Sequence, residues 1–191
     1  DFIQNFQGGT RNHRYKFIDG SFPAMAGAGS LKLSKYTVRA LEIPPSQLNP
    51  IRIPYRGRIL KWPGDRLYFP WTIRILDDQQ AGGLSSVWEA FHTWSNGMND
   101  HVTNVHDTPG AGSSGTLPWA TDWTIAQLDE QGDEPANVIK EIKLVGCWPT
   151  VIGPINLDAN SIDTLVEFTV TIEYQWYEIL TPGVNSTQNE V

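Results

Sequence analysis

The side chains that could carry out chemistry are few, and the densest group lies between residues 92 and 107. It contains residue types that bind metal ions, namely His92, Asp100, His101, His106 and Asp107. Their spacing fits no standard ligand motif, and the Gly/Ser-rich loop that follows would not hold them rigidly. We therefore expect no metal site and no cofactor.

Nucleophilic chemistry finds no better support. Cys147 is the single cysteine, placed between Gly146 and Trp148 in a predicted strand with no base at a predictable distance, which favours a buried thiol. The segment GAGSSG (110–115) lacks the lysine of a phosphate-binding loop, and no G-x-S-x-G nucleophile elbow occurs. With no catalytic constellation, we expect that the protein is not an enzyme.

Composition narrows the class of protein. The 191 residues suit one domain, and 14 basic against 21 acidic residues give a net charge of −7. This balance argues against a protein that coats duplex DNA, which needs clustered Lys and Arg. No apolar run is long enough to span a membrane, and no signal-peptide pattern is present, so we expect a soluble globular protein made inside the cell.

The aromatic and turn-forming residues predict a mainly β fold. Eight Trp, six Tyr and seven Phe accompany 17 Gly and 13 Pro, which favours strands joined by loops. The charged fraction of 18% is below the usual value of about 25%. Such depletion suits a protein that covers its surface with copies of itself, and an ordinary β-rich monomer fits the composition equally well.

The periodicity of the apolar residues predicts where the strands and the helix lie. We expect strands at 12–19, 31–43 (where a short helix is the alternative), 67–76, 119–128, 138–148 and 166–177, and a hairpin whose strands run through Ile51–Ile53 and Ile59–Trp62, with turns at 54–57 and 63–65. One amphipathic helix is predicted at 84–98, its aromatic stripe packed on a sheet. The expected organisation is a flexible N-terminal arm (1–11), a domain at 12–178 that includes a long loop at 99–117, and a C-terminal tail (179–191).

Two stretches resemble a known family, the tail tube proteins of contractile-tailed bacteriophages, which are related to the type VI secretion tube protein. Residues 140–178 carry a strand with a G-x-WPT-x-x-G element and a closing EFTVTIEYQWYE strand. Residues 53–78 carry a hairpin, a Gly-Asp-Arg turn and a W-T-x-x-x-x-x-D strand. The motif residues are Gly64, Asp65, Arg66, Trp148, Pro149 and Thr150.

The resemblance implies a structural virion protein of the tail. Its expected fold is a β-sandwich or barrel-like subunit with one flanking α-helix, six copies of which form a ring whose strands close into a continuous inner β-barrel. Stacked hexameric rings would form the conduit for genome delivery into the bacterial host. The implied partners are other copies of the chain, a tail sheath protein, a tape measure protein, and baseplate and tail terminator proteins, with DNA passing through the lumen without specific binding and no membrane involved.

Two sets of residues are candidate contact sites. The hairpin tip, Tyr55, Arg56, Gly57 and Arg58, concentrates basic charge on an acidic protein and is our candidate for the contact between rings. Glu167 and Glu173 lie on the polar face of the last predicted strand, and we hypothesise that they face the lumen, where acidic groups repel DNA phosphates. An ordinary solvated turn and an ordinary solvated outer face are the equally simple alternatives.

Two other functions remain open at this point. A tube-initiator protein at the baseplate, from the same family, would form one ring without propagating. A Trp-rich carbohydrate-binding β-sandwich module is the alternative from a different class, although most Trp residues fall on faces that a core would claim.

Overall fold

The computed structural model describes residues 10–27, 31–78, 86–105, 117–129 and 137–180. Within these ranges the elements are β1 (Tyr15–Asp19), η1 (Ala24–Ala26, a 3-10 helix), β2 (Val38–Leu41), β3 (Ser46–Tyr55), β4 (Arg58–Tyr68), β5 (Trp71–Leu76), α2 (Val87–Met98), β6 (Thr121–Leu128), β7 (Val138–Ile152), β8 (Glu167–Glu173) and β9 (Trp176–Leu180). The expected segment 1–11 falls mostly outside the described residues, and the expected tail does so from residue 181, since β9 continues to residue 180.

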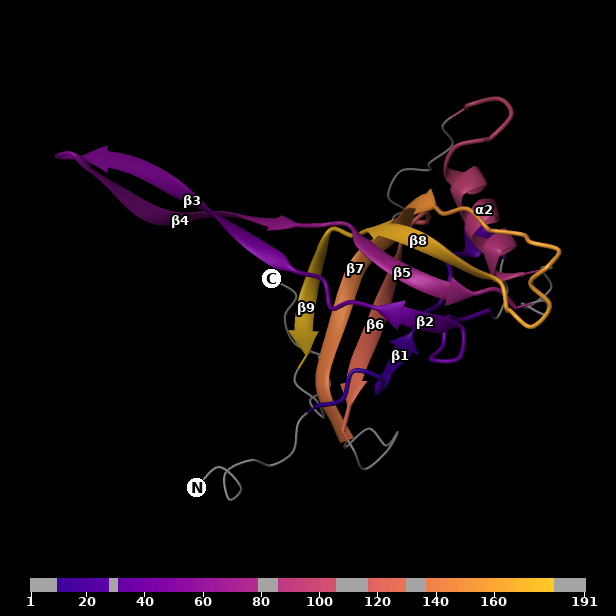
Figure 1. The fold of residues 1–191 in the computed structure, drawn as a ribbon. Coiled ribbons are helices and arrows are strands. Elements are labelled where there is room, and N and C mark those ends of the chain that lie inside the picture. The colour runs from indigo at the N-terminus through magenta and orange to yellow at the C-terminus, as the bar shows by residue number, and fades with distance from the viewer. Residues whose placement is uncertain (1–9, 28–30, 79–85, 106–116, 130–136, 181–191) are drawn as a thin grey trace, which may run out of the picture.

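The body is one seven-stranded sheet that bends on itself. The order is β1-β6-β7-β8-β5-β2, and β9 also pairs with β7. β7 serves both halves, because residues 138–147 pair with β6 and residues 148–152 pair with β8. In Figure 1, β6, β7 and β9 run up the view while β5 and β8 cross it. The predicted β-sandwich or barrel-like subunit with one flanking helix is confirmed for the described residues.

The bend is made at Gly146 of β7. Its φ of 67° is left-handed, and a Cβ there would lie 2.9 Å from Cγ of Gln175, so a larger residue would be strained. The strand opposite breaks at the same level, with β8 and β9 on either side of residues 174–175. The prediction of one strand at 166–177 was therefore wrong, and Trp176, expected on its apolar face, is 45% exposed.

Two predicted boundaries were wrong at prolines. The strand expected at 67–76 is divided between β4 and β5 at Pro70, which has no N–H to give to a ladder. The turn expected at 63–65 lies inside β4. Gly64 permits this, because a Cβ there would stand 2.6 Å from the carbonyl oxygen of Asn49 on β3, so only glycine allows the two strands to approach so closely.

Residues 31–43, expected to be extended, contain only the four-residue strand β2. Ser34 and Thr37 form a turn, in which the backbone N–H of Ser34 donates to Oγ1 of Thr37 (3.0 Å) and that hydroxyl donates to the carbonyl oxygen of Ser34 (3.1 Å). Hydroxyl side chains thus satisfy the backbone locally, in competition with strand pairing.

The core between the two halves is aromatic. Phe91 lies 6.1 Å from Trp94 in a stacked arrangement on α2, and both rings meet the indole of Trp123 edge to face. Three fully or almost fully buried tryptophans each donate the indole N–H to a loop carbonyl, which ties the loops to the core: Trp71 to Glu42, Trp94 to Trp119, and Trp123 to Ser21.

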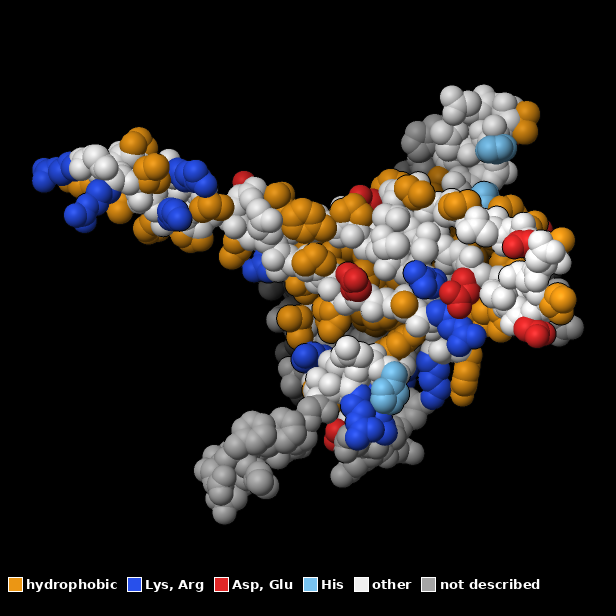
Figure 2. All heavy atoms as spheres, viewed as in Figure 1, with side chains coloured by type: hydrophobic (Ala, Val, Ile, Leu, Met, Phe, Trp, Pro, Cys, Tyr) orange, Lys and Arg blue, Asp and Glu red, His pale blue; other side chains and the backbone are white. Residues whose placement is uncertain are grey.

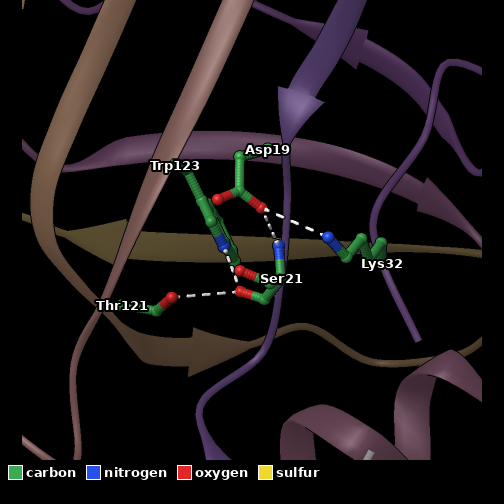
Figure 3. A network of polar contacts seen from close by, with 5 residues as sticks. All are labelled: Asp19, Ser21, Lys32, Thr121 and Trp123. Atoms are coloured by element: carbon green, nitrogen blue, oxygen red, sulfur yellow. Dashed lines mark hydrogen bonds and ion pairs between the residues drawn. The ribbon is translucent and has the colours of Figure 1, made fainter. Parts of the chain in front are cut away.

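Figure 3 shows the hydrogen bond from Trp123 to Ser21 and its neighbours. The carbonyl oxygen of Ser21 accepts from the indole N–H of Trp123 (2.8 Å) and from Oγ1 of Thr121 (3.2 Å), both on β6. The backbone N–H of Ser21 donates to Oδ1 of Asp19 (3.2 Å), and Nζ of Lys32 lies 4.0 Å from the same oxygen. This network fixes the chain after β1 against β6 and has a structural role.

The helix predicted at 84–98 is present from residue 87 onward, and residue 84 lies outside the described ranges. Ser86 caps it, since the backbone N–H of Glu89 donates to Ser86 Oγ (3.2 Å). Its buried face packs on the sheet, where Phe91 meets Phe168 of β8 at 6.2 Å between ring centroids. The predicted packing role of the aromatic stripe is confirmed.

Candidate assembly surfaces

The most prominent surface is a β-hairpin formed by β3 and β4, which we call the arm (residues 46–68). It forms a separate two-stranded sheet and extends far from the body in Figure 1. A two-stranded hairpin is at best marginally stable alone in water. Every β3 residue is exposed, and in β4 only Gly64 and Tyr68 are partly covered. Among the described residues, the arm beyond its root therefore has no packing partner.

Strand register gives the arm two different faces. Ile51 pairs with Trp62, and Ile53 pairs with Leu60, so these side chains form an apolar ladder on one face, which Tyr55 extends toward the tip. All five are exposed, Trp62 by 66%. A contiguous apolar face of this kind marks an interaction site.

The opposite face of the arm combines basic and apolar side chains, because Arg52 and Lys61 share it with Pro54 and Ile59. Arg52 pairs with Lys61 directly across the hairpin, and like charges in that position repel one another. The arm as a whole has five basic residues and one acidic residue, a net charge of +4, which leaves −11 for the rest of the chain. Figure 2 shows blue side chains clustered along the outer part of the arm. The arm thus favours an acidic partner.

The arm's prolines limit how it can bind. Pro50 and Pro54 lie in β3, and Pro63, which pairs with Pro50, lies in β4. Prolines on an exposed strand remove ladder donors and discourage edge-to-edge pairing. The faces of the arm, rather than its edges, are therefore suited to contact a partner.

The tip is a two-residue turn with an unusual residue in it. Tyr55 pairs with Arg58, and the two central residues, Arg56 (φ 47°) and Gly57 (φ 75°), are both left-handed. Such type I′ geometry normally selects Asn-Gly, and an arginine there carries backbone strain. All four predicted contact residues lie together at the far end of the arm, where their role remains a proposal.

The root of the arm is held by three tyrosines. The ring of Tyr68, at the end of β4, meets Tyr174 at 5.9 Å and Tyr177 at 5.5 Å, both edge to face. Burial, together with Tyr177, raises the pKa of Tyr174 to about 12. This cluster joins the arm to β9 and to the break between β8 and β9, so it fixes the direction in which the arm leaves the body.

The family-motif residues have structural contacts. Nη1 of Arg66 donates to Oγ of Ser46 (3.1 Å) across the arm, next to Gly64 and Asp65 in β4. The remaining three lie in the second half of β7: Trp148 meets Trp119 edge to face at 6.1 Å, Pro149 pairs with Ile172, and Oγ1 of Thr150 donates to the carbonyl oxygen of Thr171.

The polar face of β8 points away from the core. Phe168, Val170 and Ile172 are buried, so Glu167 and Glu173 lie on the other side of the sheet, as the alternation predicted. That face is not uniformly acidic: Nε of Arg39 lies 3.7 Å from Oε1 of Glu167, and Arg74 on β5 pairs with residue 169 of this face. Whether it faces a lumen remains a proposal.

The residues considered for catalysis or metal binding are placed by the structure where they fall in the described ranges. Cys147 is fully buried, and burial raises the pKa of its thiol, which suits packing rather than attack. Oδ1 of Asp100 accepts the backbone N–H groups of Val102 and Thr103 (2.8 Å each), which lowers the pKa of Asp100. No group of three metal-binding side chains occurs in the described ranges, and His106 and Asp107 lie outside them. No helix in those ranges could cross a membrane.

Sequence reasoning missed a second exposed surface, the loop between β7 and β8 (153–166, here called the acidic loop). Residues 156–165 are all exposed, and Leu157 (84%) and Ile162 (89%) are among the most exposed large apolar side chains described. Asp158 and Asp163 are its only charged residues. In the sequence this loop is a run of apolar and acidic residues without the two-residue alternation of a strand. That pattern does not indicate that the apolar side chains are exposed.

Comparisons with known proteins agree with the resemblance. No protein-family model matches the chain. The chain is 26% identical over 165 residues to the tail tube protein of Serratia phage KSP90, covering 86% of this chain and 85% of that protein. It is 23% identical over 146 residues to the tail tube protein gp19 of Enterobacteria phage T4, covering 75% of this chain and 80% of that protein.

The fold has solved counterparts. A chain in the cryo-EM structure of the anti-feeding prophage baseplate aligns with a TM-score of 0.59 at 14% identity, covering 94% of this chain and all of that chain. A chain in the sheath-tube complex of an extracellular contractile injection system (PVC) aligns with a TM-score of 0.56 at 13% identity, covering 91% and 93%. At these identities the likeness shows the fold. Together with the curated relatives, it confirms the resemblance of this chain to the bacteriophage tail tube proteins.

Proposed function

We propose that this chain is the subunit of the inner tail tube of a contractile-tailed bacteriophage, in which stacked hexameric rings form the conduit for the genome. The observation that carries the proposal is the similarity to tail tube proteins across 86% of the chain. The arm adds a physical reason for self-assembly, because its apolar ladder has no partner among the described residues of its own subunit.

The sheet edges support ring closure. Among the described residues, β1 and β2 end the strand order, and β9 pairs on one side only, with β7. Unpaired edges are templates for another chain, and closing a ring of six subunits into one barrel removes them. The prolines of the arm discourage strand pairing at its edges. We therefore assign the arm to the contact between rings, made through the tip residues Tyr55, Arg56, Gly57 and Arg58.

The lumen would be lined in part by the polar face of β8. Glu167 and Glu173 would repel phosphates, so that DNA passes without specific binding. Arg39 and Arg74 reduce the net negative charge of this face. The face would therefore form a lumen wall that interacts weakly with DNA and is not strongly acidic.

The partners follow from the tube role. A tape measure protein would share the lumen with DNA, a sheath protein would surround the tube, and baseplate and terminator proteins would bind its two ends. The protein would belong to the virion tail, be assembled in the host cytoplasm, and have no catalytic activity. Of the two solved structures described above that share the fold, one is of a baseplate and the other is of a sheath-tube complex.

The alternative from the same family is a tube-initiator protein that forms a single ring at the baseplate. The carbohydrate-binding alternative loses support, because six of the eight tryptophans lie in the core or against it and only Trp62 and Trp176 are substantially exposed. These two belong to different elements, the arm and β9.

Negative-stain electron microscopy of the purified chain over a concentration series tests the proposal. We expect hollow tubes of six-fold symmetry whose number rises steeply with concentration. Single rings that never lengthen would support the tube-initiator role instead. A chain that stays monomeric at every concentration and binds sugars in a screening panel would overturn the tube role.

The tip contact has its own test. Arg56→Glu with Arg58→Glu should abolish tubes while leaving single rings, and normal tubes from this variant would refute the contact. Arg56→Asn is the matched control, because it removes one charge while relieving the left-handed backbone, and Arg56→Lys retains the charge.

A further inference from the structure

We infer that the arm of one copy docks on the acidic loop of the next copy, so that tube growth is head-to-tail through these two surfaces. The inference rests on the proposed tube function and names the surface that receives the arm. The arm (46–68) offers an apolar ladder beside basic side chains. The acidic loop (153–166) offers exposed aliphatic side chains beside carboxylates.

The two surfaces match in chemistry. The arm has a net charge of +4, and the acidic loop has Asp158 and Asp163 without a basic residue. Trp62 on the arm is 66% exposed, and Leu157 and Ile162 on the loop are 84% and 89% exposed. Apolar burial would supply the affinity, and the opposite charges would set the orientation and exclude the like-charged pairings of arm with arm and loop with loop.

The two surfaces also lie at opposite ends of the subunit. In Figure 1 the arm extends to the left of the body and the loop from β7 to β8 lies at its right. Figure 2 shows acidic and apolar side chains over that right-hand end. Different patches at opposite ends make a heterologous contact, which leaves both ends of an assembly open for growth. A self-complementary patch would stop at a dimer.

The acidic loop is a formed surface. Oδ1 of Asp158 accepts the backbone N–H of Asn160 (2.9 Å), and the carbonyl oxygen of Asp158 accepts that of Ser161 (3.1 Å). Oγ of Ser161 lies 3.3 Å from Oγ1 of Thr164, which links the two turns of the loop. The loop therefore presents its aliphatic side chains from a defined backbone and needs less ordering when the arm arrives.

The other exposed turn, residues 99–105, is a poorer receiver. It also carries an exposed valine, Val102, and an acidic residue, Asp100. However, its single carboxylate, Asp100, is followed by His101, whereas the acidic loop has two carboxylates and no Lys, Arg or His. The acidic loop retains more negative charge and more apolar surface for a basic partner.

A charge exchange tests the pairing. Arg56→Glu with Arg58→Glu is first shown to lower the tube yield, measured by sedimentation and microscopy, at least tenfold. Adding Asp158→Asn with Asp163→Lys to the same chain should restore at least half the wild-type yield. Asparagine at 158 retains the acceptor oxygen for Asn160, so the loop keeps its shape. The matched control is Glu42→Lys, an exposed acidic residue outside the loop, which should restore nothing.

Cross-linking gives a second readout. Cys147 is buried, so a chain carrying Arg58→Cys and Asp163→Cys reacts only at the two new thiols, and assembled tubes treated with a short bismaleimide should give a ladder of covalent oligomers. The control pair, Arg58→Cys with Lys140→Cys, should stay monomeric.

The outcomes separate the inference from the function. If the wild-type chain forms tubes but charge exchange fails to rescue and both cysteine pairs stay monomeric, the inference is overturned and the tube role stands. If the wild-type chain forms neither rings nor tubes, the proposed function fails first.

Discussion

At the scale of single residues, glycines decide where this sheet bends and where its strands approach. Gly153, after β7, has no room for a side chain, since a Cβ would lie 2.5 Å from Oγ1 of Thr169 and 2.8 Å from its carbonyl oxygen. Gly97, within α2, differs, because a Cβ there would meet Met25 at an ordinary 3.5 Å.

These two sites predict opposite effects. Gly153→Ala should lower the free energy of unfolding by about 1–3 kcal/mol through overpacking against backbone. Gly97→Ala should raise it by up to about 1 kcal/mol, because alanine favours the helix. Urea unfolding of both variants measures the difference, and two changes of the same sign would contradict it.

A second prediction at this scale concerns alkaline pH. The pKa of Tyr174 is raised from the ordinary 10 to about 12, so the folded state retains the phenolic proton that the unfolded chain releases. Its stabilising contribution is complete below pH 10 and is lost between pH 10 and 12. Burial also raises the pKa of Tyr15, which acts in the same direction. Tyr174→Phe should flatten the fall in unfolding free energy over this range, and an unchanged slope would contradict the assignment.

At the scale of elements, the arm separates folding from assembly. Trp62 packs on no core, whereas Trp94 is fully buried against Phe91 and Trp123. Trp62→Ala should change the free energy of unfolding by less than about 0.5 kcal/mol and abolish tubes. Trp94→Ala should cost about 3–5 kcal/mol. Chemical unfolding and microscopy of both variants test this, and a stability loss of equal size in Trp62→Ala would place the arm in the subunit core.

The secondary structure illustrates what local pattern can predict. The helix and the strands with strict alternation, such as β8, were predictable because the period of their apolar residues reports one buried face. The break at residues 174–175 was not predictable from the local pattern, because it lies opposite the bend at Gly146 in a different strand. The strand predicted at 67–76 is divided at Pro70, which has no N–H for a ladder, and the turn predicted at 63–65 failed because pairing with β3 continues through Gly64.

At the scale of the whole molecule, the arm is an insertion between two paired strands. Leu41 of β2 pairs with Ile73 of β5, and inside the arm Gln47 pairs with Leu67. Replacing residues 48–66 by Asn-Gly would close the hairpin with a two-residue turn at that pair and leave the tyrosines at the root in place.

This armless chain should fold with nearly unchanged stability and fail to form tubes. Mixed with the full chain, it should shorten tubes at well below equal proportions, because each incorporated copy receives an arm but offers none. Circular dichroism checks the fold, and tube-length distributions check the termination. Tubes of normal length at a one-to-three mixture would contradict head-to-tail growth.

The sequence by itself determined the class of this protein: a mainly β subunit, related to tail tube proteins, with a hairpin whose basic tip is set apart from an acidic chain. Composition, two-residue alternation and local motifs are properties of neighbouring residues, so they survive without coordinates. Only the tertiary structure decided that residues 46–68 leave the body as an arm held at its root, that residues 156–165 are all exposed, and that Arg39 lies beside Glu167. Burial and charge pairing depend on residues far apart in the chain, and no local pattern contains them.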